Sequence, residues 1–304
     1  MKLTMTNPDV STTGSDKLVL ALTDELVTIG IPPRPTILQS IEREMRKDQP
    51  DFSTLEVVIS LDVGVAASLL KIANSPFFGV SSAHVNTVKD ALQILGLKVV
   101  STAIAGLSLR KAFATVPNLE RFWDASACVA QISAWLTLQV RCSDRTVRPE
   151  EVYTLGLFRD VGIPVLLSNF SNYTDILKLA NSEAVQAFTD IEDLELGVNH
   201  ALIGAKLAEE WEMSSEYRDA IEFHHDRSMI EGVGATTIPK VSRYFIAISQ
   251  LAEHFHQRAT HQSHTLEWDK LGAACLDVLH ISQERQTELF EQMLADKVPL
   301  RPQF

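Results

Sequence analysis

LGLFRDVGIPVLL, residues 155–167, is an almost entirely apolar stretch near the middle of the 304-residue sequence. Its composition predicts a buried helix, and Gly162 and Pro164 predict that this helix is interrupted. The one strongly polar feature inside the stretch is the charged pair Arg159 and Asp160. Because an unpaired buried charge is strongly destabilising, we expect Asp160 to be satisfied by Arg159, by a nearby histidine or by a helix N-terminus. Arg159 and Asp160 are therefore the first candidate site residues.

The segments on both sides of this stretch have helical periodicity, and one long helix is expected over residues 192–211. No segment before residue 116 alternates with period two, and Pro117 and Asn118 mark a boundary. The sequence thus predicts an all-α fold of two packed helical bundles. The expected parts are a disordered tail over 1–15, an N-terminal bundle over 16–116, a second bundle over 117–235 and C-terminal helices over 236–304 that pack on the second bundle.

Asn74 and Ser75 stand directly before Pro76 and two aromatic residues, Phe77 and Phe78. Asn and Ser compete for backbone hydrogen bonds and Pro cannot continue a helix, so the stretch is explained by helix termination. The same mixture of polar and aromatic groups on a loop also suits a surface that binds a partner. Both interpretations stay open, and Asn74, Ser75, Phe77 and Phe78 are the candidate partner surface.

The composition is that of a globular protein, with 45% hydrophobic and 22% charged residues. The formal net charge is −12 and basic residues are nowhere concentrated, so nucleic acid is not an expected partner. The N-terminus lacks the apolar segment of a secretory signal, and the most apolar run, residues 99–109, is too short to cross a bilayer. We expect a cytoplasmic protein without a membrane partner.

Several motifs resemble, in the same order, those of the HDOD family, over roughly residues 20–235. They are IPPRP from residue 31, ISLDVGVAASLLKIANSPFFG from 59, VKDALQILGL from 88, FWDASACVA from 122, LGLFRDVGIPVLL from 155, NHALIGAKLAEEW from 199 and AIEFHHD from 220. The resemblance implies that the second bundle is HD-like, because HDOD modules are related to the HD phosphohydrolases. It also implies a regulatory role in bacterial signalling.

The resemblance further implies where the metal ligands of the catalytic relatives would fall. These positions hold Ala125 or its neighbour Ser126, then Arg159, Asp160, and Ser249 or Gln250. An arginine side chain is always protonated and has no lone pair for a metal, so among the four positions Asp160 alone keeps a ligand. A catalytic zinc-type site keeps about three protein ligands and an open position. We therefore expect no catalytic metal, no cofactor and no enzymatic activity.

Three histidines also stand at motif positions: His200, His224 and His225. In the HD-GYP relatives, similar histidines bind additional metals. Structural hydrogen bonding, for example to Asp160, is the interpretation we favour, while a residual metal site and a contact with a ligand or partner stay open. The predicted vestigial HD pocket comprises Ala125, Arg159, Asp160, His200, His224, His225 and Ser249.

Two functional classes are compatible with these features. The first is a non-catalytic signal-transduction or scaffold protein that binds another protein, with its partner surface where the two bundles meet, near residues 73–79 and Arg159. The alternative is a metal-dependent phosphohydrolase or phosphodiesterase of the HD superfamily that has relocated its ligands. Nucleotide binding without turnover is a third interpretation, although the sequence has no glycine-rich phosphate loop. The partner, the input signal and the oligomeric state are not indicated.

Overall fold

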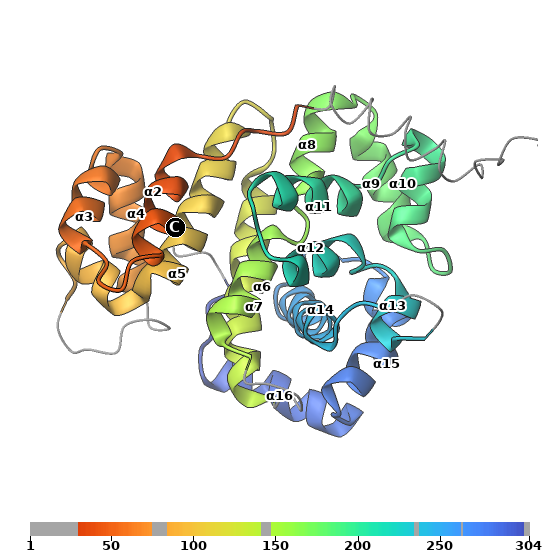
Figure 1. The fold of residues 1–304 in the computed structure, drawn as a ribbon. Coiled ribbons are helices and arrows are strands. Elements are labelled where there is room, and N and C mark those ends of the chain that lie inside the picture. Colours follow the sequence, from red (N-terminus) through yellow and green to blue (C-terminus); the bar gives the residue numbers. More distant parts are fainter. Residues whose placement is uncertain (1–29, 75–83, 141–146, 234–236, 263, 301–304) are drawn as a thin grey trace, which may run out of the picture. The chain divides into compact units, whose positions relative to one another are not determined.

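A computed structural model describes residues 30–74, 84–140, 147–233, 237–262 and 264–300. All secondary structure in these ranges is helical, which confirms the all-α prediction (Figure 1). The helices are α2 (Thr36–Met45), α3 (Phe52–Ser60), α4 (Val63–Ala73), α5 (Val88–Ala112), α6 (Glu120–Gln139), α7 (Pro149–Phe158), α8 (Gly162–Asn169), α9 (Tyr173–Ser182), α10 (Phe188–Leu196), α11 (His200–Glu210), α12 (Ser215–Glu222), α13 (Arg227–Glu231), α14 (Lys240–Thr260), α15 (Glu267–Leu279) and α16 (Gln283–Ala295).

The chain divides into two compact units, Met1–Ile31 and Pro32–Phe304. Within the first unit only residues 30 and 31 are described, so the tail expected over residues 1–15 lies outside the described residues. In the second unit, α2 to α5 pack on one another, and the helices from α6 onward pack among themselves. The boundaries expected at residues 116 and 235 stay predictions, because both lie inside the second unit.

The helices α3 to α5 begin at capping side chains. Asp51 and Asp62 each accept two backbone N–H groups at the start of α3 and α4, and Thr87 accepts one at the start of α5. Gly96 has φ 75° and ψ 158°, so α5 consists of two helical parts that meet at a kink. A glycine adopts this conformation without the strain that a side chain would bring.

By length and composition, α5 could cross a membrane, with a mean hydropathy of 1.6 in its most apolar window. The window is 44% buried inside the fold, where α5 packs on α2, α3, α4 and α7. A single apolar helix is weak evidence for a membrane span, because a core helix has the same composition.

Helix α14 lies at the centre of the second group of helices, with α6, α7, α12, α13 and α15 packed around it (Figure 1). Helix α6 is buried on all sides along residues 126–137, which explains why its sequence is apolar without a polar face. A Cβ atom on Gly156 of α7 would lie 2.5 Å from the Cα atom of Ala130 of α6, so these two helices touch at their backbones. This packing fixes the end of α7, from which the candidate site begins.

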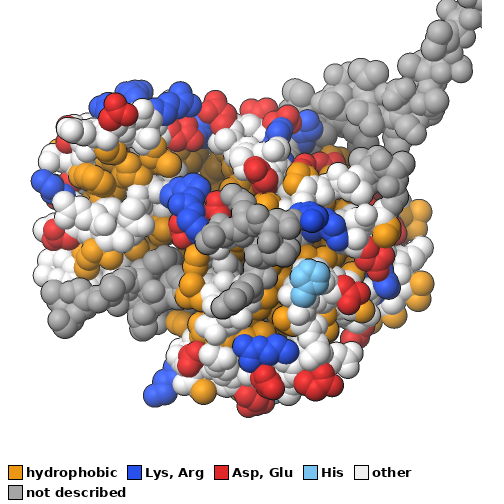
Figure 2. All heavy atoms as spheres, turned by 60° about the horizontal axis from the view of Figure 1, so that its bottom comes forward, with side chains coloured by type: hydrophobic (Ala, Val, Ile, Leu, Met, Phe, Trp, Pro, Cys, Tyr) orange, Lys and Arg blue, Asp and Glu red, His pale blue; other side chains and the backbone are white. Residues whose placement is uncertain are grey.

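Charged side chains of both signs are mixed on the face drawn in Figure 2. Lysine and arginine side chains are scattered among acidic and hydrophobic ones on this face instead of gathering into one patch. A protein that binds a phosphate backbone neutralises several phosphates with neighbouring basic residues. Among the described residues, this face therefore lacks the cluster of neighbouring basic residues that binding to a phosphate backbone needs.

Asn74 ends α4 and fastens it to the start of the next described segment. Its Nδ2 donates to the carbonyl oxygens of Leu70 (2.7 Å) and Val85 (2.9 Å), and its Oδ1 accepts from the Val85 N–H (2.8 Å). The amide of Asn74 thus serves the fold, in agreement with helix termination. The other three candidate surface residues, Ser75, Phe77 and Phe78, lie outside the described residues.

The Asn74→Ala substitution is expected to lower the free energy of unfolding by about 1–3 kcal/mol, because it leaves partly buried backbone groups of Val85 without partners. Chemical denaturation followed by circular dichroism measures this change. Asn86→Ala is the matched control, since the exposed Asn86 side chain only donates to the His84 carbonyl oxygen. Equal stability of the two variants would contradict the structural role of Asn74.

Candidate functional site

The stretch 155–167 forms the end of α7, a turn and the start of α8. Arg159 and Asp160 lie in the turn, and Gly162 is the first residue of α8. Pro164 stands in the first turn of α8, where backbone N–H groups have no partner within the helix. A proline there, which lacks an N–H, therefore costs the helix no hydrogen bond. A Cβ atom on Gly162 would lie 2.0 Å from the carbonyl oxygen of His200, so glycine is required for this close approach of α8 and α11.

His200 is placed at the site because it is the first residue of α11. Gly197 ends α10 in a left-handed conformation (φ 73°), and the Asn199 side chain then caps α11 by accepting the N–H of Leu202. The continuous helix expected over residues 192–211 is therefore wrong. The physical reason is that the left-handed glycine and the cap together start a new helix, whose first turn points into the core.

His224 and His225 follow α12 in the turn before α13, and they meet Asp160 and His200. One ligand atom from each of the four residues lies within 4.8 Å of the others. His200 Nε2 is 3.3 Å from His224 Nε2 and 3.2 Å from His225 Nε2. Asp160 Oδ1 is 3.2 Å from His224 Nε2 and 3.7 Å from His200 Nε2. Three imidazoles and a carboxylate are a donor set that fits zinc and similar transition ions.

The second ring nitrogen of each histidine, Nδ1, faces an oxygen acceptor. These acceptors are Glu192 Oε2 at 2.7 Å for His200, the Ile221 carbonyl oxygen at 2.7 Å for His224, and a carboxylate oxygen of Glu267 for His225. The histidine side chains are nearly inaccessible to solvent, and the ring of Phe188 stacks on that of His225 with 5.0 Å between the centroids. The orientation of each ring is therefore set by a hydrogen bond on the side away from the cluster.

Arg159 forms ion pairs and hydrogen bonds with the other carboxylate oxygen of Asp160 and with residues of α14. Its Nη2 donates to Asp160 Oδ2 (3.0 Å) and Glu253 Oε2 (2.6 Å), and its Nη1 donates to the Ser249 carbonyl oxygen (3.3 Å). The Arg159 side chain is 3% exposed, whereas those of Asp160 and Glu253 are 24% and 20% exposed. The guanidinium group is thus a buried cation between two carboxylates. Of the partners expected for Asp160, namely Arg159, a nearby histidine or a helix N-terminus, the structure shows Arg159 and His224.

Burial and neighbouring charges shift the pKa values in this region in opposite directions. Burial raises the pKa of Asp160, but the Arg159 charge, the hydrogen bond with His224 and the neighbouring histidines together hold the pKa well below its usual range. Burial lowers the pKa of His200, but the charge and hydrogen bond of Glu192 and the charge of Asp160 together raise it above the usual value. Burial and the neighbouring His225 lower the pKa of His224 to about 3. Asp160 is therefore an anion that faces imidazoles with different affinities for a proton.

The remaining positions of the predicted pocket supply no metal ligand. Ala125 lies on α6 and carries only a methyl group, and the neighbouring Ser126 hydroxyl donates to the Phe122 carbonyl oxygen (2.9 Å). The Ser249 hydroxyl donates to the Ile246 carbonyl oxygen (3.0 Å). The predicted pocket residues thus divide: Asp160 and the three histidines converge, and Arg159 occupies the space beside them.

Sequence reasoning missed three acidic residues that complete the site: Glu192, Glu253 and Glu267. Glu253 follows Ser249 by four residues on α14, so helical spacing places both on one face, and this signal could have found it. Glu192 is fully buried and also accepts from the Tyr173 hydroxyl, whereas Glu267 pairs with Lys270. Glu192 precedes His200 by only eight residues, whereas Glu267 follows His225 by 42, so for Glu267 the sequence carries no such local signal.

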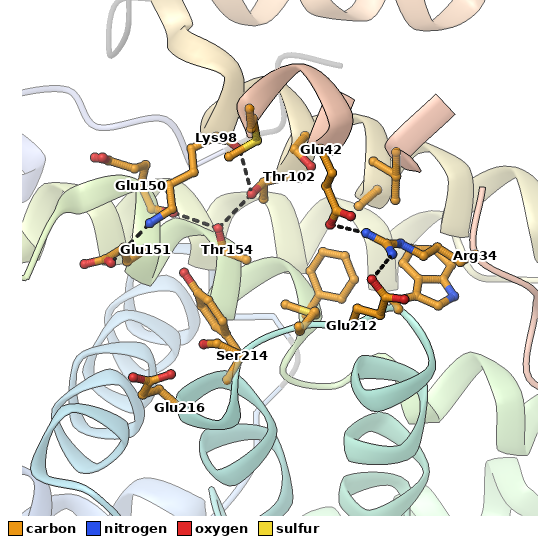
Figure 3. A pocket seen from close by; sticks show the side chains of 18 of the residues that line it. Arg34, Glu42, Lys98, Thr102, Glu150, Glu151, Thr154, Glu212, Ser214 and Glu216 are labelled. Carbon is orange, nitrogen blue, oxygen red and sulfur yellow. Dashed lines mark hydrogen bonds and ion pairs between the residues drawn. The ribbon is translucent and has the colours of Figure 1, made fainter. Parts of the chain in front are cut away.

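Two cavities lie near the site. A cavity of about 400 Å³ lies between α2, α5, α7 and the start of α12 (Figure 3). In it Arg34 pairs with Glu42 and with Glu212 (2.7 Å), and Thr102 lies 2.9 Å from Thr154. A second cavity, of about 560 Å³, reaches the histidine cluster at His225. The first cavity lies where the two groups of helices meet, which is the region expected to bind a partner.

Solved structures share this fold. An HDOD domain protein of unknown function from Geobacter sulfurreducens has a TM-score of 0.67 at 21% identity, over 94% of this chain and 96% of the other. A Marinobacter aquaeolei VT8 protein, provisionally named a signal transduction protein, has a TM-score of 0.63 at 21% identity, over 95% and 60%. A Shewanella amazonensis SB2B protein, provisionally named a phosphohydrolase, has a TM-score of 0.60 at 20% identity, over 93% and 96%. At these identities the likeness shows the fold alone.

An uncharacterized protein of Treponema pallidum (strain Nichols) is 24% identical over 217 residues, which are 70% of this chain. The match covers 41% of that relative, so the chain spans about two fifths of the length of the curated protein it matches. The family model of the HDOD domain matches residues 31–227, which include the proline-rich entry, the Arg159 and Asp160 turn and the double histidine. The chain therefore belongs to the HDOD domain family.

Proposed function

We propose that this protein is a non-catalytic signal-transduction or scaffold module that acts by binding another protein. The observation that carries the proposal is the position of the Arg159 guanidinium, held between Asp160 and Glu253 and bonded to the Ser249 carbonyl oxygen. Hydrolysis of a phosphoester in an HD-type site needs a metal that activates water. A guanidinium supplies positive charge but cannot coordinate and activate a water molecule. Arg159 therefore cannot take the place of the catalytic metal in phosphoester hydrolysis.

Exposed apolar side chains support a role in protein contacts. Val57, Leu61 and Val63, at the corner between α3 and α4, are 65%, 83% and 79% exposed. Large apolar side chains that gather on a surface mark interaction sites. The cavity of Figure 3 is a further place that a partner could use, and the segment 73–79 stays the candidate surface that the sequence indicates. We propose a cytoplasmic protein partner and no nucleic acid, in keeping with the acidic composition.

A metal-dependent phosphohydrolase is the second candidate function. The specific observation in its favour is the convergence of Asp160 with His200, His224 and His225. The cavity that reaches His225 is also lined by Arg227 and Lys270, which could attract a phosphate group. This function requires an ion with an open position for water as well as the protein ligands.

One experiment separates the two candidates. Purified protein loaded with Mn²⁺, Fe²⁺ or Zn²⁺ is expected to hydrolyse p-nitrophenyl phosphate and its bis ester no faster than the metal alone. In native cell extract, the same protein is expected to capture a partner, and Phe77→Ala or Phe78→Ala is expected to lose that partner while remaining folded.

Leu138→Ala is the matched control for the capture, because Leu138 is an exposed apolar residue on α6, outside the proposed surface. Turnover that exceeds the metal blank and disappears in Asp160→Ala would contradict the scaffold proposal. Capture of every partner by the folded Phe variants would show that the surface lies elsewhere.

A further inference from the structure

We propose that Asp160, His200, His224 and His225 form a closed site for one divalent transition ion of the zinc class, with the Arg159 guanidinium in the place of a second cation. This inference goes beyond the proposed function, because a scaffold needs no metal. It also replaces the expectation, based on the sequence, that no metal is bound.

Four of the six distances between the ligand atoms are close to those of a tetrahedral site, and all six lie within 4.8 Å. Ligand atoms at about 2.0–2.1 Å from a tetrahedral zinc ion lie about 3.3 Å from each other. His200 Nε2 lies 3.3 Å from His224 Nε2 and 3.2 Å from His225 Nε2. Asp160 Oδ1 completes the set at 3.2 Å from His224 Nε2 and 3.7 Å from His200 Nε2. Side chains that converged only for packing would not need to present four lone pairs at this spacing.

The hydrogen-bond partners favour tautomers in which the facing nitrogens carry no hydrogen. A neutral imidazole has one N–H, and the Nδ1 atoms of the three histidines face Glu192, the Ile221 carbonyl oxygen and Glu267. With the N–H on Nδ1, each Nε2 presents a lone pair to the other Nε2 atoms and to the Asp160 carboxylate. Facing lone pairs repel one another unless a cation lies between them. Ligating histidines in metal sites donate their other N–H in this manner.

The charges around the cluster also favour a divalent cation. Four carboxylates, those of Asp160, Glu192, Glu253 and Glu267, are within the network, and Arg159 and Lys270 are its cationic side chains. Two negative charges remain when the histidines are neutral. One divalent ion among the three Nε2 atoms and Asp160 Oδ1 balances them.

Arg159 restricts the site to one ion and keeps it closed. Asp160 Oδ2 accepts two hydrogen bonds from the guanidinium, so only Oδ1 is directed to the histidines. Three imidazoles and one oxygen fill a tetrahedral shell, which is the property of a structural zinc site. The ion would join the turn before α8, the start of α11 and the turn after α12. We therefore assign it a role in holding these three segments together.

The test is the metal content of the full chain purified without chelator or added metal. Plasma mass spectrometry is expected to find about one zinc per chain, and chelation followed by zinc readdition is expected to lower and then restore the melting temperature by about 5 °C or more. Four-coordinate Co²⁺ absorbs visible light strongly, so Co²⁺ in place of zinc is expected to show this absorption. None of these measurements needs a variant.

His225→Gln is expected to weaken zinc binding by more than about 100-fold, because it removes a ligand and not only an outer partner. His254→Gln is the matched control, since His254 stacks on Trp268 away from the cluster. Less than about a tenth of an equivalent of metal, with no change in melting temperature on zinc addition, would overturn the proposal. It is also overturned if folded His225→Gln keeps the ion as the control does, or if Co²⁺ shows the weak spectrum of a six-coordinate ion.

Discussion

Arg159→Met is expected to lower the free energy of unfolding by about 3–5 kcal/mol, because it leaves two carboxylates near each other in a mostly buried site. The guanidinium is 3% exposed and donates to both Asp160 and Glu253. Methionine preserves much of the side-chain volume, so the change isolates the loss of charge and of hydrogen bonds. Urea denaturation in the presence of a chelator measures the effect at constant metal content.

Two further variants identify the cause of that loss. Arg159→Met combined with Glu253→Gln is expected to be more stable than Arg159→Met alone, since one of the two stranded charges is removed. Arg227→Met is the matched control, because Arg227 pairs with Glu231 across one exposed helical turn, where an ion pair contributes about 0.5 kcal/mol or less. A loss of under about 1 kcal/mol for Arg159→Met would contradict the role of Arg159 as the neutralising cation.

Gly162→Ala is expected to destabilise the protein by about 3 kcal/mol or more, because overpacking that moves backbone is more costly than overpacking absorbed by a side chain. The new Cβ would lie 2.0 Å from the carbonyl oxygen and 2.9 Å from the Cα atom of His200. Helices α8 and α11 must then move apart, and His200 moves with the start of α11. Thermal and chemical denaturation measure the loss, and NMR spectra of the histidine ring protons report the displacement.

Gly106→Ala is the matched control for this substitution. Gly106 lies within α5, and its new Cβ would meet Leu157 Cδ1 at 3.5 Å, an ordinary contact. Because alanine is the better helix former, this variant is expected to be unchanged or up to about 1 kcal/mol more stable. Similar behaviour of the two alanine variants would mean that the close approach at Gly162 has no energetic role.

The helical architecture could be predicted from the sequence because it depends on local patterns. Asp62 and Asn74 mark the two ends of α4, and Gly96 interrupts α5, as the residue types indicate. The break between α10 and α11 escaped prediction, since a single glycine inside a helical pattern is usually tolerated. Gly197 breaks the helix because Asn199 offers the backbone an alternative cap two residues later.

The candidate site was predictable where its residues stand in motifs and hidden where they do not. Asp160, His200 and the double histidine were identified as pocket residues, and the structure brings them together. Their convergence depends on contacts between residues far apart in the chain, such as the contact of Asp160 with His224, which stands 64 positions later. Helical periodicity has no information about such pairs. It therefore could not decide between structural hydrogen bonding and a metal site.

The ion pair of Arg159 and Glu253 also bears on how this sequence can change over generations. A single substitution that turned Arg159 into a metal-ligating residue would strand the Glu253 carboxylate, which is 20% exposed. A single substitution of Glu253 would likewise remove one of the two acids that Arg159 neutralises. Each first step toward a catalytic centre therefore lowers stability before any activity is gained. The ion pair of Arg159 and Glu253 therefore opposes such substitutions when they occur one at a time.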